Sequence, residues 1–264
     1  MNNDRKIIFF DVDGTILSHR TSRISESTRS AIKAVQKNGH LACLNTGRTL
    51  AEMEQEITGI GFDGYVCGCG TYISLGSSVL LHHTLQPELI IRLLEDFRRY
   101  RLDAVLEGTK AVYYDALLQN PFFIKVRDDQ IRVHGFSVRT FDDRDIEGDK
   151  FCILPQKGGD LKSFFKKYKN VFEFIDRGHD FFEIVPAGFS KATGIRFLEE
   201  HLGIPHENTY ALGDSSNDLP MLNYVRHSIA MGNSSEEVRK EASFVTEDVD
   251  RDGVAHALRH YHII

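Results

Sequence analysis

Two aspartates separated by one residue follow the first apolar run of the chain, Lys6–Phe10. A short continuous apolar run indicates a strand buried on both faces of a parallel sheet, and ligands of such sheets bind at the carboxyl ends of the strands. At that position Asp11 could attack phosphorus and form an acyl phosphate that water then opens. Asp13 could protonate the leaving oxygen and afterwards activate the water. The alternative is a turn in which both carboxylates merely accept backbone N–H groups.

A second acidic cluster, Gly213–Asp218, follows another short apolar run, Tyr210–Leu212. Magnesium is usually held by one or two carboxylates together with waters and substrate phosphate. Asp11 and Asp214 supply those carboxylates if both strands lie near the centre of one sheet. Taken alone, the second cluster could equally be a solvated turn rich in Asp and Asn.

Two further segments offer groups that bind anions. The segment Leu44–Arg48 is expected to lead from a strand into a helix, with the Thr46 hydroxyl and backbone N–H groups at the positive helix end. Lys191 is expected to begin another helix, directly after Ser190, and carries a compact charge suited to phosphate. Each segment alone is weak evidence. Together with the acidic clusters they match the needs of phosphoryl transfer, namely a metal, fixed cations and donors around the phosphoryl oxygens.

The elements that must position these residues alternate between strand and helix in both outer parts of the chain. Strands are expected over residues 6–10, 40–44, 65–69, 209–212, 225–230 and 244–245, and helices over 25–38, 48–57, 191–201, 219–224 and 254–261. This alternation predicts an α/β fold with a doubly wound, Rossmann-like parallel sheet.

The alternation of strand and helix is lost in the middle of the chain. Helices are expected over 87–100 and 159–168, hairpins over 103–114 and 171–185, and a strand over 150–154, whereas residues 120–148 give no clear pattern. Hairpins within an α/β chain indicate an inserted domain. We therefore expect a core domain of residues 1–81 and 188–264, interrupted by an α+β cap of residues 82–187.

Bulk composition excludes several partners. The net charge is −6, so there is no overall basic field for nucleic acid or an anionic membrane. No segment approaches the roughly 20 apolar residues of a membrane-spanning helix, and the polar start of the chain does not resemble a signal peptide. The four cysteines show no disulfide pattern, and the Cys67/Cys69 pair is interpreted as buried thiols rather than a metal site. The expected location is the cytoplasm.

The motifs together resemble the haloacid dehalogenase superfamily, in particular its Cof-type phosphatases with a large C2-type cap. Four segments of the chain resemble the four motifs of that superfamily in order: Phe10–Ile16, Asn45–Arg48, Ser190–Lys191 and Gly213–Asp218. Its C-terminal region is similar to Met231–Ala242, Val245–Thr246 and Asp252–Val254. The resemblance covers both outer parts of the chain, and the cap region matches only in outline.

The resemblance implies a magnesium-dependent phosphatase that hydrolyses small phosphate monoesters, such as a sugar phosphate, nucleotide or cofactor phosphate. Asp11 is the implied nucleophile and Asp13 the implied general acid and base. Mg²⁺ is implied to bind the Asp11 side chain, the Asp13 backbone carbonyl and the Asp214 side chain. The implied phosphate ligands are Thr46, Gly47, Lys191 and Asn217, and the supporting residues are Arg48 and Asp218. Asp218 either supports the metal or orients Lys191.

Two other functions remain open from the sequence. A phosphomutase of the same superfamily shares these motifs, and a non-catalytic metabolite sensor could keep the fold. The expected partner is a small phosphorylated metabolite, and the chain is expected to be a monomer or weak homo-oligomer. The chain departs from the family pattern at Cys69-Gly70, where many relatives have Asn-Gly. The resemblance implies that this position lies near the boundary between core and cap.

Overall fold

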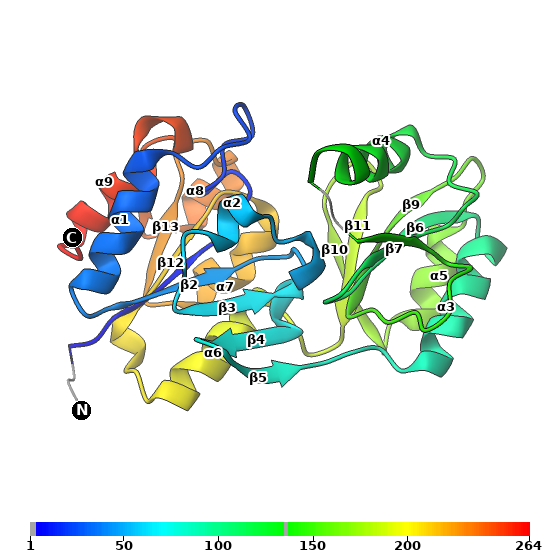
Figure 1. The fold of residues 1–264 in the computed structure, drawn as a ribbon, viewed down its shortest axis with the longest axis horizontal. Coiled ribbons are helices and arrows are strands. Elements are labelled where there is room, and N and C mark those ends of the chain that lie inside the picture. Colours follow the sequence, from blue (N-terminus) through cyan, green and yellow to red (C-terminus); the bar gives the residue numbers. More distant parts are fainter. Residues whose placement is uncertain (1–3, 135–136) are drawn as a thin grey trace. The chain divides into compact units, whose positions relative to one another are not determined.

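The chain folds into two units, each with its own sheet and hydrophobic core (Figure 1). The structure is a computed structural model that describes residues 4–134 and 137–264. The first unit, which we call the core unit, contains the chain up to Gly47 together with Gln55–Leu81 and Ser190–Ile264. The second, which we call the cap unit, contains Arg48–Glu54 and His82–Phe189.

An eight-stranded sheet organises the core unit. Its strands are β1 (Ile7–Phe10), β2 (Leu41–Asn45), β3 (Gly64–Cys67), β4 (Tyr72–Leu75), β5 (Ser78–His82), β12 (Thr209–Gly213), β13 (His227–Ala230) and β14 (Phe244–Val245). The strand order is β14-β13-β12-β1-β2-β3-β4-β5. All pairs from β14 to β3 are parallel, and β4 is antiparallel to β3. Because β1, β2 and β12 are fully buried, their largely apolar sequences fit strands covered on both faces.

Helices lie on both faces of this sheet (Figure 1). They are α1 (Glu26–Lys37), α2 (Gln55–Thr58), α6 (Lys191–Leu202), α7 (Leu219–Tyr224), α8 (Glu236–Glu241) and α9 (Gly253–His260). Residues of α6, α7 and α8 pack with Ile7 and Phe9 on one face, and α1 packs beside α9. Ser25 caps α1 by accepting the N–H of Thr28. This architecture confirms the predicted doubly wound α/β fold.

A six-stranded sheet organises the cap unit. Its strands are β6 (Leu102–Glu107), β7 (Val112–Tyr114), β8 (Val138–Thr140), β9 (Lys150–Pro155), β10 (Phe172–Asp176) and β11 (Phe182–Pro186), in the order β10-β11-β9-β6-β7-β8. Helices α3 (Pro87–Arg99) and α5 (Leu161–Tyr168) cover one face through an aromatic core around Phe97, Phe151 and Phe164. Helix α4 (Pro121–Asp129) packs Phe123 on the other face. The mixed sheet confirms the predicted inserted α+β region.

Short helical turns complete the described chain. They span Leu50–Glu52, Gly68–Gly70, His206–Asn208, Ser216–Asp218 and Val249–Arg251, with a π-type turn at Gln130–His134. No helix within residues 4–134 and 137–264 is long and apolar enough to cross a membrane. All four cysteines are buried thiols, as the sequence predicted.

One predicted helix is wrong. The sequence predicted a helix from Arg48 to Ile57, but the structure has the turn Leu50–Glu52 and only four helical residues from Gln55. The Glu52 carboxylate accepts both the N–H and the hydroxyl of Thr49, a capping box that starts this turn, and the chain leaves helical geometry directly after Glu52. Met53 is then extended, with φ −84° and ψ 104°. The segment after Gly47 therefore offers no regular α-helix end to an anion.

Candidate active site

The parallel registers bring three predicted site segments to one edge of the core sheet. Strand β1 lies between β12 and β2, and Phe10 is in register with Leu212 on one side and Leu44 on the other. The chain winds outward in opposite directions from this point, so β1 and β12 flank the topological switch point at which open α/β sheets bind ligands. The residues that follow these strands include Asp11, Asp214 and Thr46.

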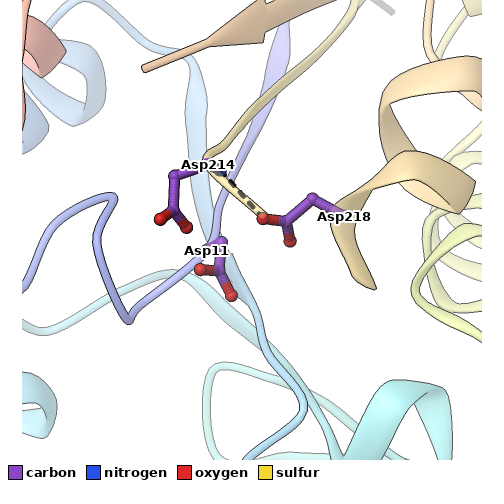
Figure 2. A group of neighbouring side chains, drawn as sticks. All are labelled: Asp11, Asp214 and Asp218. Atoms are coloured by element: carbon purple, nitrogen blue, oxygen red, sulfur yellow. Dashed lines mark hydrogen bonds between the residues drawn. The ribbon is translucent and has the colours of Figure 1, made fainter. Parts of the chain in front are cut away.

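Three carboxylates meet at this edge. Asp11, Asp214 and Asp218 each present an oxygen within 4.8 Å of the others. Their residues are only 4%, 8% and 0% exposed. Figure 2 shows them converging from the ends of β1 and β12 and from the turn at Ser216–Asp218. Burying three carboxylates together is costly unless positive charge is supplied.

Lys191 supplies one positive charge. Its Nζ donates to Asp11 Oδ1 at 2.6 Å and to Asp218 Oδ1 at 2.5 Å. The position is fixed because Lys191 is the first residue of α6, whose N-cap Ser190 accepts the N–H of Thr193. Burial by itself lowers the pKa of Lys191, but the carboxylates of Asp11 and Asp218 outweigh burial and raise that pKa above its ordinary value. The lysine therefore stays charged at neutral pH.

Asp218 already uses both of its oxygens. Besides Lys191, it accepts the backbone N–H of Asp214 at 2.9 Å, drawn in Figure 2, and that of Ser215 at 3.0 Å. These bonds fix the loop after β12 and orient the lysine. Asp218 is thus suited to a supporting position, whereas Asp11 and Asp214 face the centre of the cluster.

The remaining charge imbalance favours a cation. Burial, followed by the neighbouring carboxylates, raises the pKa of Asp11 to about 7 and the pKa of Asp214 to about 8. Asp214 Oδ1 is buried and has no hydrogen-bond partner among the described residues. Hard divalent cations such as Mg²⁺ prefer carboxylate oxygens. The donor set, with its surplus of negative charge and a carboxylate oxygen left over, fits such an ion.

Other buried polar atoms near these motifs are also unsatisfied by the described residues. In the core unit they are Thr15 Oγ1, Asn45 Oδ1 and Asp214 Oδ1. Buried polar atoms normally have partners, so a group of exceptions at one sheet edge indicates a ligand site. Gly14 allows the close approach there, since its φ is +81° and a Cβ would lie 2.2 Å from Asp214 Oδ2.

Asp13 and Thr46, also predicted as site residues, lie in the same unit as the carboxylate cluster. The charge of Asp13, which is half-buried, contributes to the raised pKa of both Asp11 and Asp214, so its carboxylate lies near them. Thr46 is buried, and its carbonyl accepts the N–H of Cys69.

Asn217 is buried, and its Oδ1 accepts the Ser215 hydroxyl at 2.6 Å, so its NH₂ group has the donors that a phosphate requires. Gly47 ends this segment of the core unit, whereas Arg48 belongs to the cap unit and pairs with Glu54 at 3.1 Å.

Sequence reasoning assigned no role to three neighbouring residues. Asn45 Nδ2 donates to the backbone carbonyl of Lys191 at 3.0 Å and so fixes the start of α6. Cys69 contributes to the raised pKa of Lys191, which places its thiol near the lysine. His19 Nε2 lies 2.9 Å from the point where a Cβ on Gly14 would stand, which puts it beside Asp214. In the sequence, Asn45 carried a signal as a polar residue ending an apolar run and Cys69 as a departure from the family pattern, whereas His19 carried none.

Comparison with known proteins agrees with this geometry. Residues 8–258 match the family described as haloacid dehalogenase-like hydrolase. Because the match spans nearly the whole chain, the protein belongs to the haloacid dehalogenase-like hydrolases. Its fold is that of the Cof-type members, subclass IIB, with a C2-type cap.

Similar proteins are phosphatases. The chain is 32% identical to the putative phosphatase YkrA of Bacillus subtilis, covering 97% of each chain. It is 28% identical to the B. subtilis 5-amino-6-(5-phospho-D-ribitylamino)uracil phosphatase YitU, again with 97% of each chain covered. A solved structure of the phosphatase BT1666 from Bacteroides thetaiotaomicron superposes with a TM-score of 0.83 at 26% identity, covering 100% of this chain and 97% of the other. The chain is thus a phosphatase acting on small phosphate esters.

Proposed function

We propose that this phosphatase is magnesium-dependent and hydrolyses small phosphate monoesters through an aspartyl-phosphate on Asp11. The observation that carries the proposal is the buried cluster in which Asp11 accepts a hydrogen bond from Lys191 beside the unpartnered oxygen of Asp214. The Asp11 and Asp214 side chains and the Asp13 carbonyl would hold Mg²⁺, which would supply positive charge that offsets the phosphoryl oxygens.

The residues of the chain carry the chemical steps. Lys191, Thr46, Gly47 and Asn217 bind the phosphoryl oxygens, and Asp11 attacks phosphorus while the bond to the leaving oxygen breaks. Asp13 gives its proton to that leaving oxygen. Asp13 then takes a proton from water, whose oxygen attacks the phosphorus of the acyl phosphate. Inorganic phosphate leaves and Asp11 is regenerated.

The substrate class follows from the relatives rather than from the site itself. YitU is named for 5-amino-6-(5-phospho-D-ribitylamino)uracil, and BT4131, which superposes with a TM-score of 0.82 at 25% identity, is a sugar phosphatase. We propose a small sugar phosphate, nucleotide or cofactor phosphate. The core residues 1–81 and 188–264 would perform the chemistry, and the cap residues 82–187 would select the substrate. We further propose a monomer or weak homo-oligomer in the cytoplasm, without nucleic acid or membrane partners.

Asp11→Asn tests the proposal. Wild-type protein with Mg²⁺ should release phosphate from p-nitrophenyl phosphate and give an acid-stable, hydroxylamine-sensitive phosphoenzyme after rapid quenching. Asp11→Asn should lose both signals with an unchanged circular dichroism spectrum. The matched control Asp250→Asn, which weakens an exposed pair with Arg20 and a hydrogen bond with Ser18, should keep them. Turnover retained by Asp11→Asn contradicts the nucleophile assignment. Isomer formed from a sugar bisphosphate without free phosphate would indicate a phosphomutase instead.

A further inference from the structure

A surface pocket of about 460 Å³, which we call the α1 pocket, lies between helix α1 and the loop that follows α2. Helix α1 contributes residues between Glu26 and Lys37, and the loop contributes Gly59 and Ile60. All of them belong to the core unit, and none is a candidate residue of the phosphoryl site. Pockets of this size accommodate small metabolites, so the lining indicates which ligand chemistry fits.

Contacts between the helix and the loop fix the walls of the α1 pocket. The Gln36 side chain donates to the carbonyl of Gly61 at 2.9 Å. Arg29 donates to the carbonyl of Glu56 at 3.3 Å and pairs with the carboxylate of the same residue. Ile60, which lines the pocket, is only 2% exposed and anchors the loop. The pocket is therefore held in shape by the folded core, and the Arg29 guanidinium is already occupied by Glu56.

Two lysines supply the charge that a ligand could use. Lys33 and Lys37 lie one turn apart on α1, so their side chains stand on the same face of the helix. Within residues 4–134 and 137–264, neither ammonium group has a hydrogen-bond or ion-pair partner. Lys33 Nζ lies 3.5 Å from the point where a Cβ on Gly61 would stand, so it reaches the loop side of the pocket.

These lysines continue a row of like charges along α1. Arg29, Lys33 and Lys37 follow one another at intervals of four residues, a spacing at which like charges destabilise a helix. Glu56 offsets the charge of Arg29, but the two lysines repel each other without such compensation. Glu26, the acid that lines the pocket, lies in the first turn of the helix. A bound anion would relieve the repulsion between the lysines.

The kind of cation favours phosphate over carboxylate. A lysine ammonium is a compact point charge that commonly binds phosphate, whereas the planar fork that matches a carboxylate belongs to arginine. Glu56 already engages the fork of Arg29. Two ammonium groups on adjacent turns can bind two neighbouring phosphoryl groups, one each.

We propose that the α1 pocket binds a diphosphate group, with one phosphoryl group at Lys33 and the other at Lys37. Ala34 and Ile60 also line the pocket and offer apolar contact to the organic part of a nucleoside diphosphate. The site binds its ligand without hydrolysing it and uses none of the groups around Asp11. It is therefore a second ligand site, and the inference does not depend on the proposed reaction.

Lysine footprinting of the full-length protein tests the proposal. The protein is acetylated in chelator with an N-hydroxysuccinimide ester, and mass spectrometry measures the rate at each lysine. Pyrophosphate and ADP should slow acetylation of Lys33 and Lys37 in a saturable way, AMP should do so more weakly, and acetate at equal ionic strength should not. Lys162 and Lys166 are the internal control, because they are exposed and have the same spacing on α5 but lie outside the pocket. The lower Kd, for ADP or for pyrophosphate, identifies the source of the diphosphate group.

A charge reversal separates binding from folding. Lys33→Glu places a carboxylate between Arg29 and Lys37, so it should keep or slightly raise the urea midpoint. It should nevertheless raise the Kd for pyrophosphate, read from protection of Lys37, about tenfold or more. The matched variant Lys162→Glu makes the same change four residues before Lys166 and should leave that Kd within about twofold.

Several outcomes overturn the proposal. Pyrophosphate and ADP leave Lys33 and Lys37 unprotected, or Lys162 and Lys166 are protected equally, in which case lysine spacing alone explains the effect. Equal protection by AMP and ADP contradicts the recognition of two phosphoryl groups, and an unchanged Kd in folded Lys33→Glu contradicts the assigned residues. Adding Asp11→Asn should leave the protection curves unchanged, and curves that depend on Asp11 would assign the diphosphate to the phosphoryl site instead.

Discussion

Each unit of the molecule buries one lysine between two carboxylates. In the core unit Lys191 binds Asp11 and Asp218, and in the cap unit Lys150 binds Glu107 and Glu183. Both lysines are at most 2% exposed. Burial acts to lower both lysine pKa values, but Cys152 and the two glutamates raise the pKa of Lys150, and the two aspartates raise the pKa of Lys191. Each even has a cysteine near its ammonium group, Cys69 in the core and Cys152 in the cap.

The two clusters differ in their surplus charge. The core cluster has a third acid, Asp214, whose Oδ1 lacks a partner among the described residues, so it carries more negative than positive charge. The cap cluster has a second cation, because Arg177 stands 3.8 Å from Glu183, so its surplus of negative charge is smaller even though Glu52 also acts on Glu107. Buried ion pairs alone are weak evidence for stability or function. The surplus charge, rather than the buried lysine, distinguishes a cation-dependent catalytic site from an internal ion-pair network.

The largest expected effect is on kcat, which should fall when Lys191 is replaced but not when Lys150 is replaced. Lys191→Met removes the cation beside the nucleophile and should lower kcat for p-nitrophenyl phosphate by about 1000-fold, as loss of a fixed donor to transition-state charge does. Lys150→Met, the matched control in the cap unit, should keep kcat within about threefold for this small substrate. Steady-state phosphate release measures both. Similar losses in both variants would remove the distinction between the clusters.

Lys150→Met, which should barely affect activity, should clearly lower the stability of the protein. Lys150→Met leaves Glu107 and Glu183 buried without their shared cation, so the free energy of unfolding should fall by about 3 kcal/mol. The loss stays near the low end of the usual range because burial already raises the pKa of Glu107 to about 7, so it can take up a proton. Urea denaturation measures the change. Combining Lys150→Met with Glu107→Gln and Glu183→Gln should recover most of it, and no recovery would contradict charge imbalance as the cause.

Two acids of the core cluster were predictable from the sequence because they directly follow short, largely apolar strands. Asp11 follows β1 and Asp214 follows β12, and the parallel pairing of these strands fixes the separation of the two acids. The sequence could not reveal that Asp218 uses both oxygens or that Asn45 fixes Lys191, since those contacts depend on tertiary geometry.

The cap cluster was not predictable in the same way. Glu107, Lys150 and Glu183 lie on neighbouring strands, and their contact depends on the antiparallel register that pairs Glu107 with Lys150 and Glu183 with Cys152. Helix α4 was also missed, because its apolar residues gather at its start and its charged residues at its end, without a consistent helical face. The helix expected after Arg48 is only a single turn, because the chain becomes extended at Met53 directly after the Thr49–Glu52 capping box.

The pH dependence of stability should locate the surplus charge in the core unit. The folded pKa values of Asp11 and Asp214, about 7 and about 8, lie above their ordinary value of 3.8. Between pH 4 and pH 8 the folded state therefore binds more protons than the unfolded state, so stability falls as pH rises and levels off above pH 8. Without metal we expect a loss of about 2 kcal/mol or more between pH 5 and pH 8.

Mg²⁺ provides the control for this prediction. The ion binds the deprotonated carboxylates, so it should restore stability more at pH 8 than at pH 5. Glu107 in the cap also has a raised pKa and contributes a slope of the same sign, but one that Mg²⁺ leaves unchanged. Asp214→Asn should remove the Mg²⁺-sensitive part alone. Urea midpoints across this pH range measure it, and stability that rises with pH in chelator would contradict the assigned charges.

The smallest effect concerns the two cysteines beside the lysines. Cys69 has a left-handed backbone, with φ 55° and ψ 38°, whereas Cys152 lies in the extended strand β9. Asn adopts the left-handed region more readily than Cys, so Cys69→Asn should raise the free energy of unfolding by about 0.5 kcal/mol and change kcat less than threefold. Cys152→Asn buries an amide in a strand without a comparable backbone gain and should be destabilising. If Cys69→Asn is also destabilising, contact of the thiol with Lys191, and not backbone conformation, determines which residue fits at position 69.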